Sequence, residues 1–299
     1  MVTTTDRTAG VAVRASAPIR DILLTAIAPA GFGTVYAATA LLLPPDRPLL
    51  AAAMRALPAG LLLLAFTRTL PRGIWWMKVI ALAVLNVGAF FPLLFVAAYR
   101  LHGGLAASLG ALQPLVVALL AVLILRTRTS PTMLIACLTA AAGVALMTTT
   151  GTTTPDPVGV AAMLTATSLM GLGIVLGRKW GSPVPPLTMT GWQLTIGGLF
   201  LWPLTLVVEG LPARFTADNL LGFLYVGLIG TALAYTMWFR GVQRLAPTAI
   251  SQLSTVNPLV ATVAGFTLLG QSFTPWQLTG FVITLAALIV GQSMNRSSK

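Results

Sequence analysis

Long apolar runs separated by short polar joins make up most of the chain. A helix needs roughly 20 apolar residues to cross about 30 Å of hydrocarbon, and it satisfies its own backbone without water. The period-two alternation that is typical of outer-membrane strands is absent from the sequence. The pattern therefore predicts an all-α integral membrane protein with ten transmembrane helices. The predicted spans are Asp21–Leu43, Leu49–Phe66, Ile74–Tyr99, Leu105–Leu125, Met133–Met147, Val158–Leu176, Leu187–Val208, Leu220–Phe239, Thr248–Leu269 and Trp276–Met294.

Two stretches of the sequence indicate an internal repeat: RLHGGLAASLGALQPLV, from Arg100, and RLAPTAISQLSTVNPLV, from Arg244. They begin 144 residues apart, and further upstream Gly33 and Gly171 correspond at an offset of 138. We predict two repeats of five helices each, and because five is odd, the second repeat enters the membrane inverted. Inverted repeats are typical of alternating-access transporters, whose substrate site lies near the membrane midplane.

Basic residues fall mainly on one side of this predicted topology. With the N-terminus inside, the inner segments hold fourteen of the eighteen Lys and Arg residues and the outer segments hold three, as the positive-inside rule requires. We therefore expect a multi-pass protein of the bacterial inner membrane with both termini in the cytoplasm. The predicted parts are a cytoplasmic tail (1–20), a first repeat (21–150), an outer linker (151–155), a second repeat (156–294) and a cytoplasmic tail (295–299).

Composition narrows the classes of function. The chain is 57% hydrophobic and 8% charged, which is far from the usage of soluble domains. Its formal net charge of +12 does not indicate nucleic-acid binding, because the basic residues lie in the joins rather than on one face. One histidine, His102, and one cysteine, Cys137, offer no acid–base pair, activated nucleophile or metal cluster. We expect no enzyme, cofactor or metal; the expected partners are a small-molecule substrate and the lipid bilayer, for a monomer or alternatively a homodimer.

Polar and aromatic side chains within the apolar runs are candidate substrate-binding residues. A polar group at mid-depth is costly and is expected to face the bundle. Interhelical hydrogen bonding is the alternative interpretation for the polar residues, and packing or interfacial anchoring for the aromatic ones. The candidates are Tyr36, Asn86, Phe90, Phe91, Gln113, Trp192, Gln193, Tyr235, Gln252 and Asn257.

Arg55 lies within a predicted span, and at the offset of 138 it corresponds to Gln193. A cation at this depth costs about 2.5 kcal/mol or more unless it is paired or hydrated. No acidic residue lies in the interior of a predicted span, since Asp21 only starts the first one. Backbone carbonyls, water or substrate are therefore the expected partners of Arg55. The two interpretations that remain are a substrate-binding cation and a structural cap on a neighbouring helix.

Pro114 and Pro258 form a second pair at the offset of 144. A proline inside a helix lacks an N–H, and its ring disrupts the preceding turn, so each is expected to kink its span. We predict a gating role for both, and a static kink is the alternative.

Several motifs resemble the EamA family of the drug/metabolite transporter superfamily: GFGTVYAAT, MRALPAGLLLL, LGALQPLVVALLAVLIL and LSTVNPLVATVAGFTLLG. The stretch LNVGAFFPLLFVAAYRL is most similar to the PecM-like branch, which is associated with export of pigments and other small metabolites. The resemblance implies a ten-helix exporter fold with spans one to four and six to nine around a central cavity and spans five and ten outside. The family's LGE motif is replaced here by Arg126–Thr127 and Gly270–Gln271, so the role of that carboxylate does not carry over.

Together these features favour a secondary transporter that exports a small neutral, zwitterionic or anionic metabolite, such as an amino acid or a pigment. We expect alternating access, as a facilitator or an exchanger. One alternative is a multidrug antiporter of organic cations and protons, which needs an anion within the membrane. The other is a non-transporting scaffold, for which neither a repeat nor paired prolines are needed.

Overall fold

The computed structural model describes residues 19–127, 131–149, 155–245 and 247–294, and all regular structure in these ranges is helical. The prediction of an all-α membrane protein is confirmed. Eight helices in the described part of the chain are long and apolar enough to cross a membrane. Two shorter apolar stretches, Leu134–Thr149 and Pro275–Val290, fall on the fifth and tenth predicted spans. The total of ten spans stays a prediction.

Each of the five predicted segments has residues outside the described ones. They are positions 1–18 of the first tail, 128–130 and 150 of the first repeat, 151–154 of the linker, 246 of the second repeat and the whole last tail, 295–299.

The helices of the first half follow one another in a fixed order. They are α1 (Ile19–Leu42), α2 (Pro48–Thr67), α3 (Trp75–Ala83), the π-helix η1 (Val84–Ala89), α4 (Phe90–Arg100), α5 (Gly103–Ala111), α6 (Gln113–Leu125) and α7 (Pro131–Thr149). The second half has the same order of elements. They are α8 (Pro157–Trp180), α9 (Pro186–Val208), α10 (Ala217–Leu224), the π-helix η2 (Tyr225–Leu233), α11 (Ala234–Arg244), α12 (Pro247–Ser254), α13 (Val256–Leu269) and α14 (Pro275–Met294).

Prolines begin many of these helices, where the missing N–H costs nothing because the first turn has no partner for it. Helix α2 gains a further cap from Glu209, whose carboxylate accepts the backbone N–H groups of Leu49 and Leu50 at 2.7 and 2.9 Å. The side chain of Arg47 donates to the carbonyls of Glu209 and Gly210, at 2.8 and 2.7 Å. These contacts fix the start of α2 against the end of α9.

Two spans contain a π-helix in their middle. Helix η1 joins α3 to α4 within the apolar stretch Trp75–Arg100, and η2 joins α10 to α11 within Ala217–Arg244. A π-turn widens the helix locally and leaves backbone geometry that recurs at functional sites. Both candidate polar contacts described below involve one of these π-helices.

Two other spans are broken by a single residue shortly before a proline. Leu112 separates α5 from α6 ahead of Pro114, with φ −69° and ψ −10°. Thr255 separates α12 from α13 ahead of Pro258, with φ −71° and ψ −14°. The expected discontinuities are therefore present at both prolines, while their role in gating stays a prediction.

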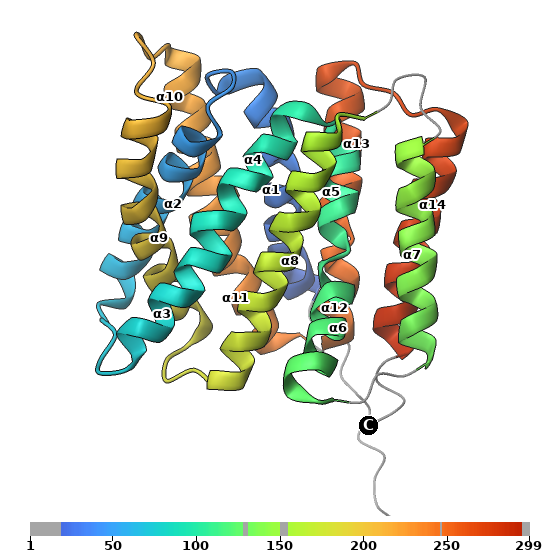
Figure 1. The fold of residues 1–299 in the computed structure, drawn as a ribbon, viewed down its shortest axis with the longest axis horizontal. Coiled ribbons are helices and arrows are strands. Elements are labelled where there is room, and N and C mark those ends of the chain that lie inside the picture. Colours follow the sequence, from blue (N-terminus) through green and yellow to red (C-terminus); the bar gives the residue numbers. More distant parts are fainter. Residues whose placement is uncertain (1–18, 128–130, 150–154, 246, 295–299) are drawn as a thin grey trace, which may run out of the picture.

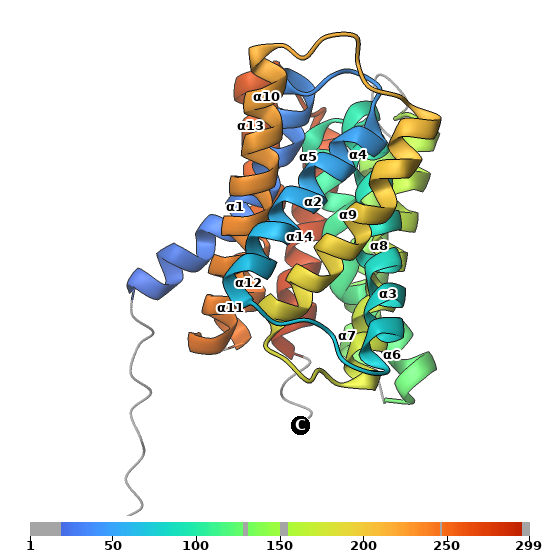
Figure 2. The same cartoon turned by 90° about the vertical axis from the view of Figure 1, so that its left-hand side faces the viewer.

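Helices from opposite halves pack closely (Figures 1 and 2). Helix α2 packs along α9, where Gly60 faces the backbone of Thr195 and Gly198 faces the backbone of Leu57, so a Cβ at either glycine would collide with the partner helix. Helix α1 packs against α11 and α13, and α8 packs against α4 and α6. Helices α7 and α14 pack on each other at one edge of the bundle (Figure 1), as the resemblance implied for spans five and ten.

The two ends of the bundle differ in charge. At the lower end in Figure 1, α6 ends beside Arg126, the last turn of α8 carries Arg178 and Lys179, and that of α11 carries Arg244. At the upper end, α8 begins at Asp156 and the last turn of α4 carries Arg100. The lower end is thus the more basic one at these helix termini.

Candidate functional site

Arg55 lies in the interior of α2 and is 4% exposed. Its Nε donates to the hydroxyl of Thr231 at 2.9 Å, and its Nη2 donates to the carbonyl of Gly230 at 3.3 Å. Both acceptors belong to η2, in the other half of the chain. Its Nη1 is buried without a hydrogen-bond partner among the described residues. The guanidinium is therefore held in place by one neighbouring helix while one donor nitrogen remains unused.

Two phenylalanines of α4 support the same guanidinium. Its central carbon lies 4.4 Å from the ring centroid of Phe91 and 5.9 Å from that of Phe95, and both rings are fully buried. A cation over an aromatic face is stabilised by about 0.5–2 kcal/mol, more when water is excluded. These rings and the two hydrogen bonds offset part of the cost of burying the charge.

Two tyrosines from other helices complete the surroundings of Arg55. Tyr36 on α1 and Tyr235 on α11 both lie within electrostatic range of its charge. The ring of Tyr235 lies 5.3 Å from that of Phe32 and stacks on that of Phe239 at 6.0 Å. The cation thus lies against aromatic rings of α4 and near tyrosines of α1 and α11, which is a setting suited to a planar or negatively charged solute.

Asn86 and Gln193 form a second polar contact between the halves. The amide nitrogen of Asn86, on η1, donates to the side-chain oxygen of Gln193, on α9, at 2.7 Å. The oxygen of Asn86 has no hydrogen-bond partner in the described structure and lies against Gly173 of α8. Both residues serve interhelical bonding, which was the alternative interpretation for each.

Gln113 and Asn257 lie next to the two helix breaks, at the first turns of α6 and α13. Both are half-buried, and the amide nitrogen of Gln113 and the side-chain oxygen of Asn257 lack partners within the described residues. Gly33 of α1 approaches the backbone carbonyl of Asn257 closely enough that a Cβ would clash with it. These two amides are therefore available for a ligand at corresponding positions of the two halves.

Three other candidates do not join the surroundings of Arg55 directly. Trp192 belongs to a separate buried cluster with Val79 and Leu82, and its indole N–H donates to the carbonyl of Thr69 at 2.5 Å. Gln252 is exposed on α12. Phe90 is half-buried, and its ring lies 5.7 Å from that of Phe91.

Sequence reasoning missed two residues of the site, Thr231 and Phe95. Threonines are frequent in these spans, and nothing in the sequence distinguishes Thr231 from the others. Phe95 could have been identified from the sequence, because it follows Phe91 by four residues and therefore lies on the same face of the helix.

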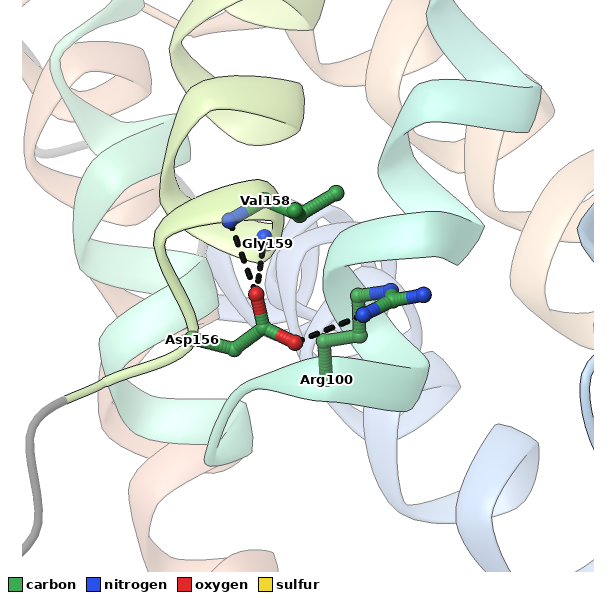
Figure 3. A network of polar contacts seen from close by, with 4 residues as sticks. All are labelled: Arg100, Asp156, Val158 and Gly159. Carbon is green, nitrogen blue, oxygen red and sulfur yellow. Dashed lines mark hydrogen bonds and ion pairs between the residues drawn. The ribbon is translucent and has the colours of Figure 1, made fainter.

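Ion pairs lie at the helix ends rather than around Arg55. Arg240 donates to Asp21 at 2.6 Å, and Arg100 donates to Asp156 at 2.7 Å (Figure 3). Asp156 also accepts the N–H of Val158 at 2.8 Å as the N-cap of α8. The hydrogen bond from Arg100 holds the pKa of Asp156 below its usual value. In the described part of the chain, no three His, Cys, Asp or Glu residues are grouped so that they could hold a metal ion.

A bundle of apolar helices with polar groups buried between its halves defines a multi-pass membrane protein. The model of the EamA-like transporter family matches the chain twice, over residues 20–149 and over residues 157–290. The chain belongs to this family, and it is a membrane transporter.

Relatives agree with this assignment. Protein PecM of Dickeya dadantii is 42% identical, over 91% of this chain and 92% of the relative, which confirms the resemblance to the PecM-like branch. The WAT1-related chloroplastic protein At3g02690 of Arabidopsis thaliana is 30% identical, over 86% of this chain and 66% of its own length. A solved structure with 15% identity covers 94% of this chain and 99% of its own, with a TM-score of 0.66, so the two share a fold.

Proposed function

We propose that this transporter moves a small neutral, zwitterionic or anionic solute by alternating access, through a site centred on Arg55. One observation carries the proposal: Nη1 of Arg55 is buried without a partner while the rest of the guanidinium is held by η2 and α4. A buried donor that is not satisfied by the protein costs about 1–3 kcal/mol, and more when it is charged. A carboxylate or carbonyl oxygen of the solute would remove that cost on binding.

In this proposal the aromatic rings of Tyr36, Phe91 and Tyr235 form the walls of the site. Gln113 and Asn257 would bind polar groups of the solute when the site is open to one side of the membrane. The pair of Asn86 and Gln193 would hold the halves in register. Trp192, Gln252 and Phe90 would act outside the immediate site, Trp192 by anchoring the α2–α3 join through its bond to Thr69.

The alternation would come from two inverted repeats of five spans, ten in all. This is supported by the recurring order of elements and by the double match to the family model. Inverted repeats rock around a fixed central site. Pro114 and Pro258 would let the two broken spans bend during this motion.

We further propose that the protein is an exporter of the bacterial inner membrane with both termini in the cytoplasm. The basic helix ends at one side of the bundle support this orientation. A cysteine at position 156, in a Cys137→Ala background, should react with an impermeant thiol reagent in intact cells. Reaction only after the cells are opened would contradict the orientation.

Organic cations fit the site less well than anions. Asp21 is the buried acidic residue of the described chain, and it lies at the start of α1 paired with Arg240, not beside Arg55. A positively charged site without a carboxylate repels cations and lacks the usual proton relay. Transport down the solute gradient, or solute exchange, therefore fits the site better than proton antiport.

The test is solute flux in proteoliposomes at zero membrane potential, with and without a pH gradient. The panel contains amino acids, aromatic acids, nucleoside-like solutes and a quaternary ammonium compound. We expect counterflow of a neutral, zwitterionic or anionic solute that is independent of the pH gradient. Concentrative uptake of the quaternary ammonium compound, driven by that gradient, would overturn both the charge argument and the coupling argument.

A further inference from the structure

Two ion pairs join helix ends from opposite halves of the chain, one at each end of the bundle. At the end where α1 begins, Arg240 contacts Asp21 at 2.6 Å, and Arg244 lies 3.8 Å from the same oxygen. At the end where α8 begins, Arg100 contacts Asp156 at 2.7 Å (Figure 3). Neither pair belongs to the site around Arg55.

The two pairs occupy similar places in the halves, although at the offset of 144 Arg100 corresponds to Arg244, which lies 3.8 Å from Asp21, and not to Arg240. Arg100 and Arg244 are the first residues of the repeated stretches and end α4 and α11. Asp21 is in the first turn of α1, and Asp156 caps the start of α8. Helix α4 packs on α8, and α11 packs on α1. Each pair therefore joins the end of one span to the start of another.

Both contacts are close because each contains a glycine. Gly159 of α8 faces the side chains of Arg100 and Leu101, and Gly241 of α11 faces Thr25 of α1. Small residues let membrane helices approach each other. The charged side chains can then bridge the two helix ends, and separating the helices requires breaking that bridge.

A cavity of about 110 Å³ lies beside the Arg100–Asp156 pair. His102, Leu105, Phe273 and Gln277 are among its lining residues. This cavity has room for a few water molecules, which could hydrate the two charged side chains when they separate.

We propose that the two pairs are latches that hold the opposite ends of the transport path closed, and that each end opens when its own pair breaks. The Arg100–Asp156 pair is the outer latch, and the Asp21–Arg240 pair, with Arg244, is the inner latch. The inference rests on the proposed alternating-access function. Because the helix contacts correspond in the two halves, breaking one latch widens one end and leaves the other closed.

The latches differ in strength. The side chains of Asp21 and Arg240 are 12% and 24% exposed, whereas those of Asp156 and Arg100 are 32% and 47% exposed. Exposed ion pairs are screened by water and salt and contribute little. The inner latch, with two arginines around one less exposed carboxylate, is therefore the stronger of the two.

The test measures distances between spin labels at each end of the full-length protein, in a Cys137→Ala background. The inner reporter pair is at Leu23 and Val242, which are exposed on α1 and α11. The outer reporter pair is at His102 and Val158, which are exposed at the starts of α5 and α8. Distance distributions are recorded for Asp21→Asn and for Asp156→Asn.

We expect Asp156→Asn to raise the fraction of long outer distances about twofold and Asp21→Asn to raise that of long inner distances about fivefold. Each variant should leave the opposite end unchanged. Charge swaps are Arg100→Asp with Asp156→Arg and Arg240→Asp with Asp21→Arg. The outer swap should restore short distances and the inner one should restore them in part, because Arg244 remains beside position 21. Recovery would show that the single variants had not simply misfolded.

The latch proposal would be overturned if the distances were unchanged in both variants or if the same end widened in both. It would also be overturned if the charge swaps restored no short distances. Solute flux is measured separately on the wild-type protein. If the distances respond as expected while the protein transports no solute of the panel, the proposed function fails and the latches stand.

Discussion

Two contacts between an α-helix and a π-helix occupy corresponding places in the halves of this transporter, yet their chemistry differs. In one, Arg55 of α2 donates to Thr231 and to the carbonyl of Gly230 on η2. In the other, Gln193 of α9 accepts from Asn86 on η1 at 2.7 Å. The positions of Arg55 and Gln193 are 138 residues apart, as are the starts of α1 and α8.

The difference shows how one architecture supports two roles. A neutral amide pair between membrane helices contributes only about 0.6 kcal/mol on average, and it carries no charge that a solute can use. A buried guanidinium with an unused donor is costly until an oxygen atom reaches it. In the proposed function, the contact of Gln193 with Asn86 stabilises the bundle, and that of Arg55 with η2 leaves a donor for a ligand.

The largest expected effect comes from replacing the cation with the amide of the other half, Arg55→Gln. Losing a charge-assisted hydrogen bond costs about 1.5–3 kcal/mol, which is roughly a tenfold to hundredfold loss of affinity. We expect a corresponding rise in the half-saturating concentration for an anionic solute in proteoliposome counterflow. Binding of a neutral solute should change less.

Two variants serve as controls for this substitution. Arg55→Lys keeps the charge but loses the forked geometry, so partial recovery is expected. Gln193→Leu removes the corresponding residue of the other half and should leave affinity for the anion almost unchanged. Equal losses in Arg55→Gln and Gln193→Leu would show that both contacts are structural.

An intermediate effect is expected at the two helix breaks. Pro114→Ala and Pro258→Ala restore an N–H and remove the ring that keeps the preceding turn from being regular, so α5 can continue into α6 and α12 into α13. Each variant should raise the thermal unfolding temperature and slow solute exchange several-fold. If the two halves exchange roles during transport, the two variants should slow it by similar factors.

Rapid exchange at the wild-type rate in both variants would mean that the breaks are static. If solute exchange slows in only one variant, only the helix break of that half takes part in gating.

The smallest effect is expected from the amide pair. A double-mutant cycle of Asn86→Leu and Gln193→Leu should give a coupling energy of about 0.6 kcal/mol in unfolding experiments. Anion affinity should stay within about twofold of the wild type, since in the described structure neither residue is hydrogen-bonded to Arg55. A coupling several times larger, accompanied by a loss of transport, would place this pair in the solute path.

Much of the fold could be predicted from the sequence, because hydrophobic length and the positions of proline determine where membrane helices begin, end and break. The predicted span Ile74–Tyr99 differs by one residue at each end from the apolar helix Trp75–Arg100. The π-helices could not be predicted, since they reflect how a whole span accommodates its neighbours rather than a local residue preference.

The site was only partly predictable for a related reason. Arg55 stood out because a cation is rare within an apolar run, whereas its partner Thr231 is an ordinary residue whose role depends on the approach of α2 to η2. Trp192 shows the converse. Trp192 lies within an apolar run, as the other candidates do, but the orientation of α9 directs its indole to the carbonyl of Thr69.

Each π-helix is also a place where the number of residues in its membrane span can change with little effect on the rest of the span. The span Trp75–Arg100 has 26 residues and its counterpart Ala217–Arg244 has 28, while η1 has 6 residues and η2 has 9. An extra residue in a regular helix rotates everything after it by about 100°, which would turn buried residues toward lipid. A π-turn takes up such a residue without that rotation. Insertions and deletions within η2 before Gly230 and Thr231, which hold Arg55, should therefore disturb the bundle less than the same changes in α9, whose glycines contact α2.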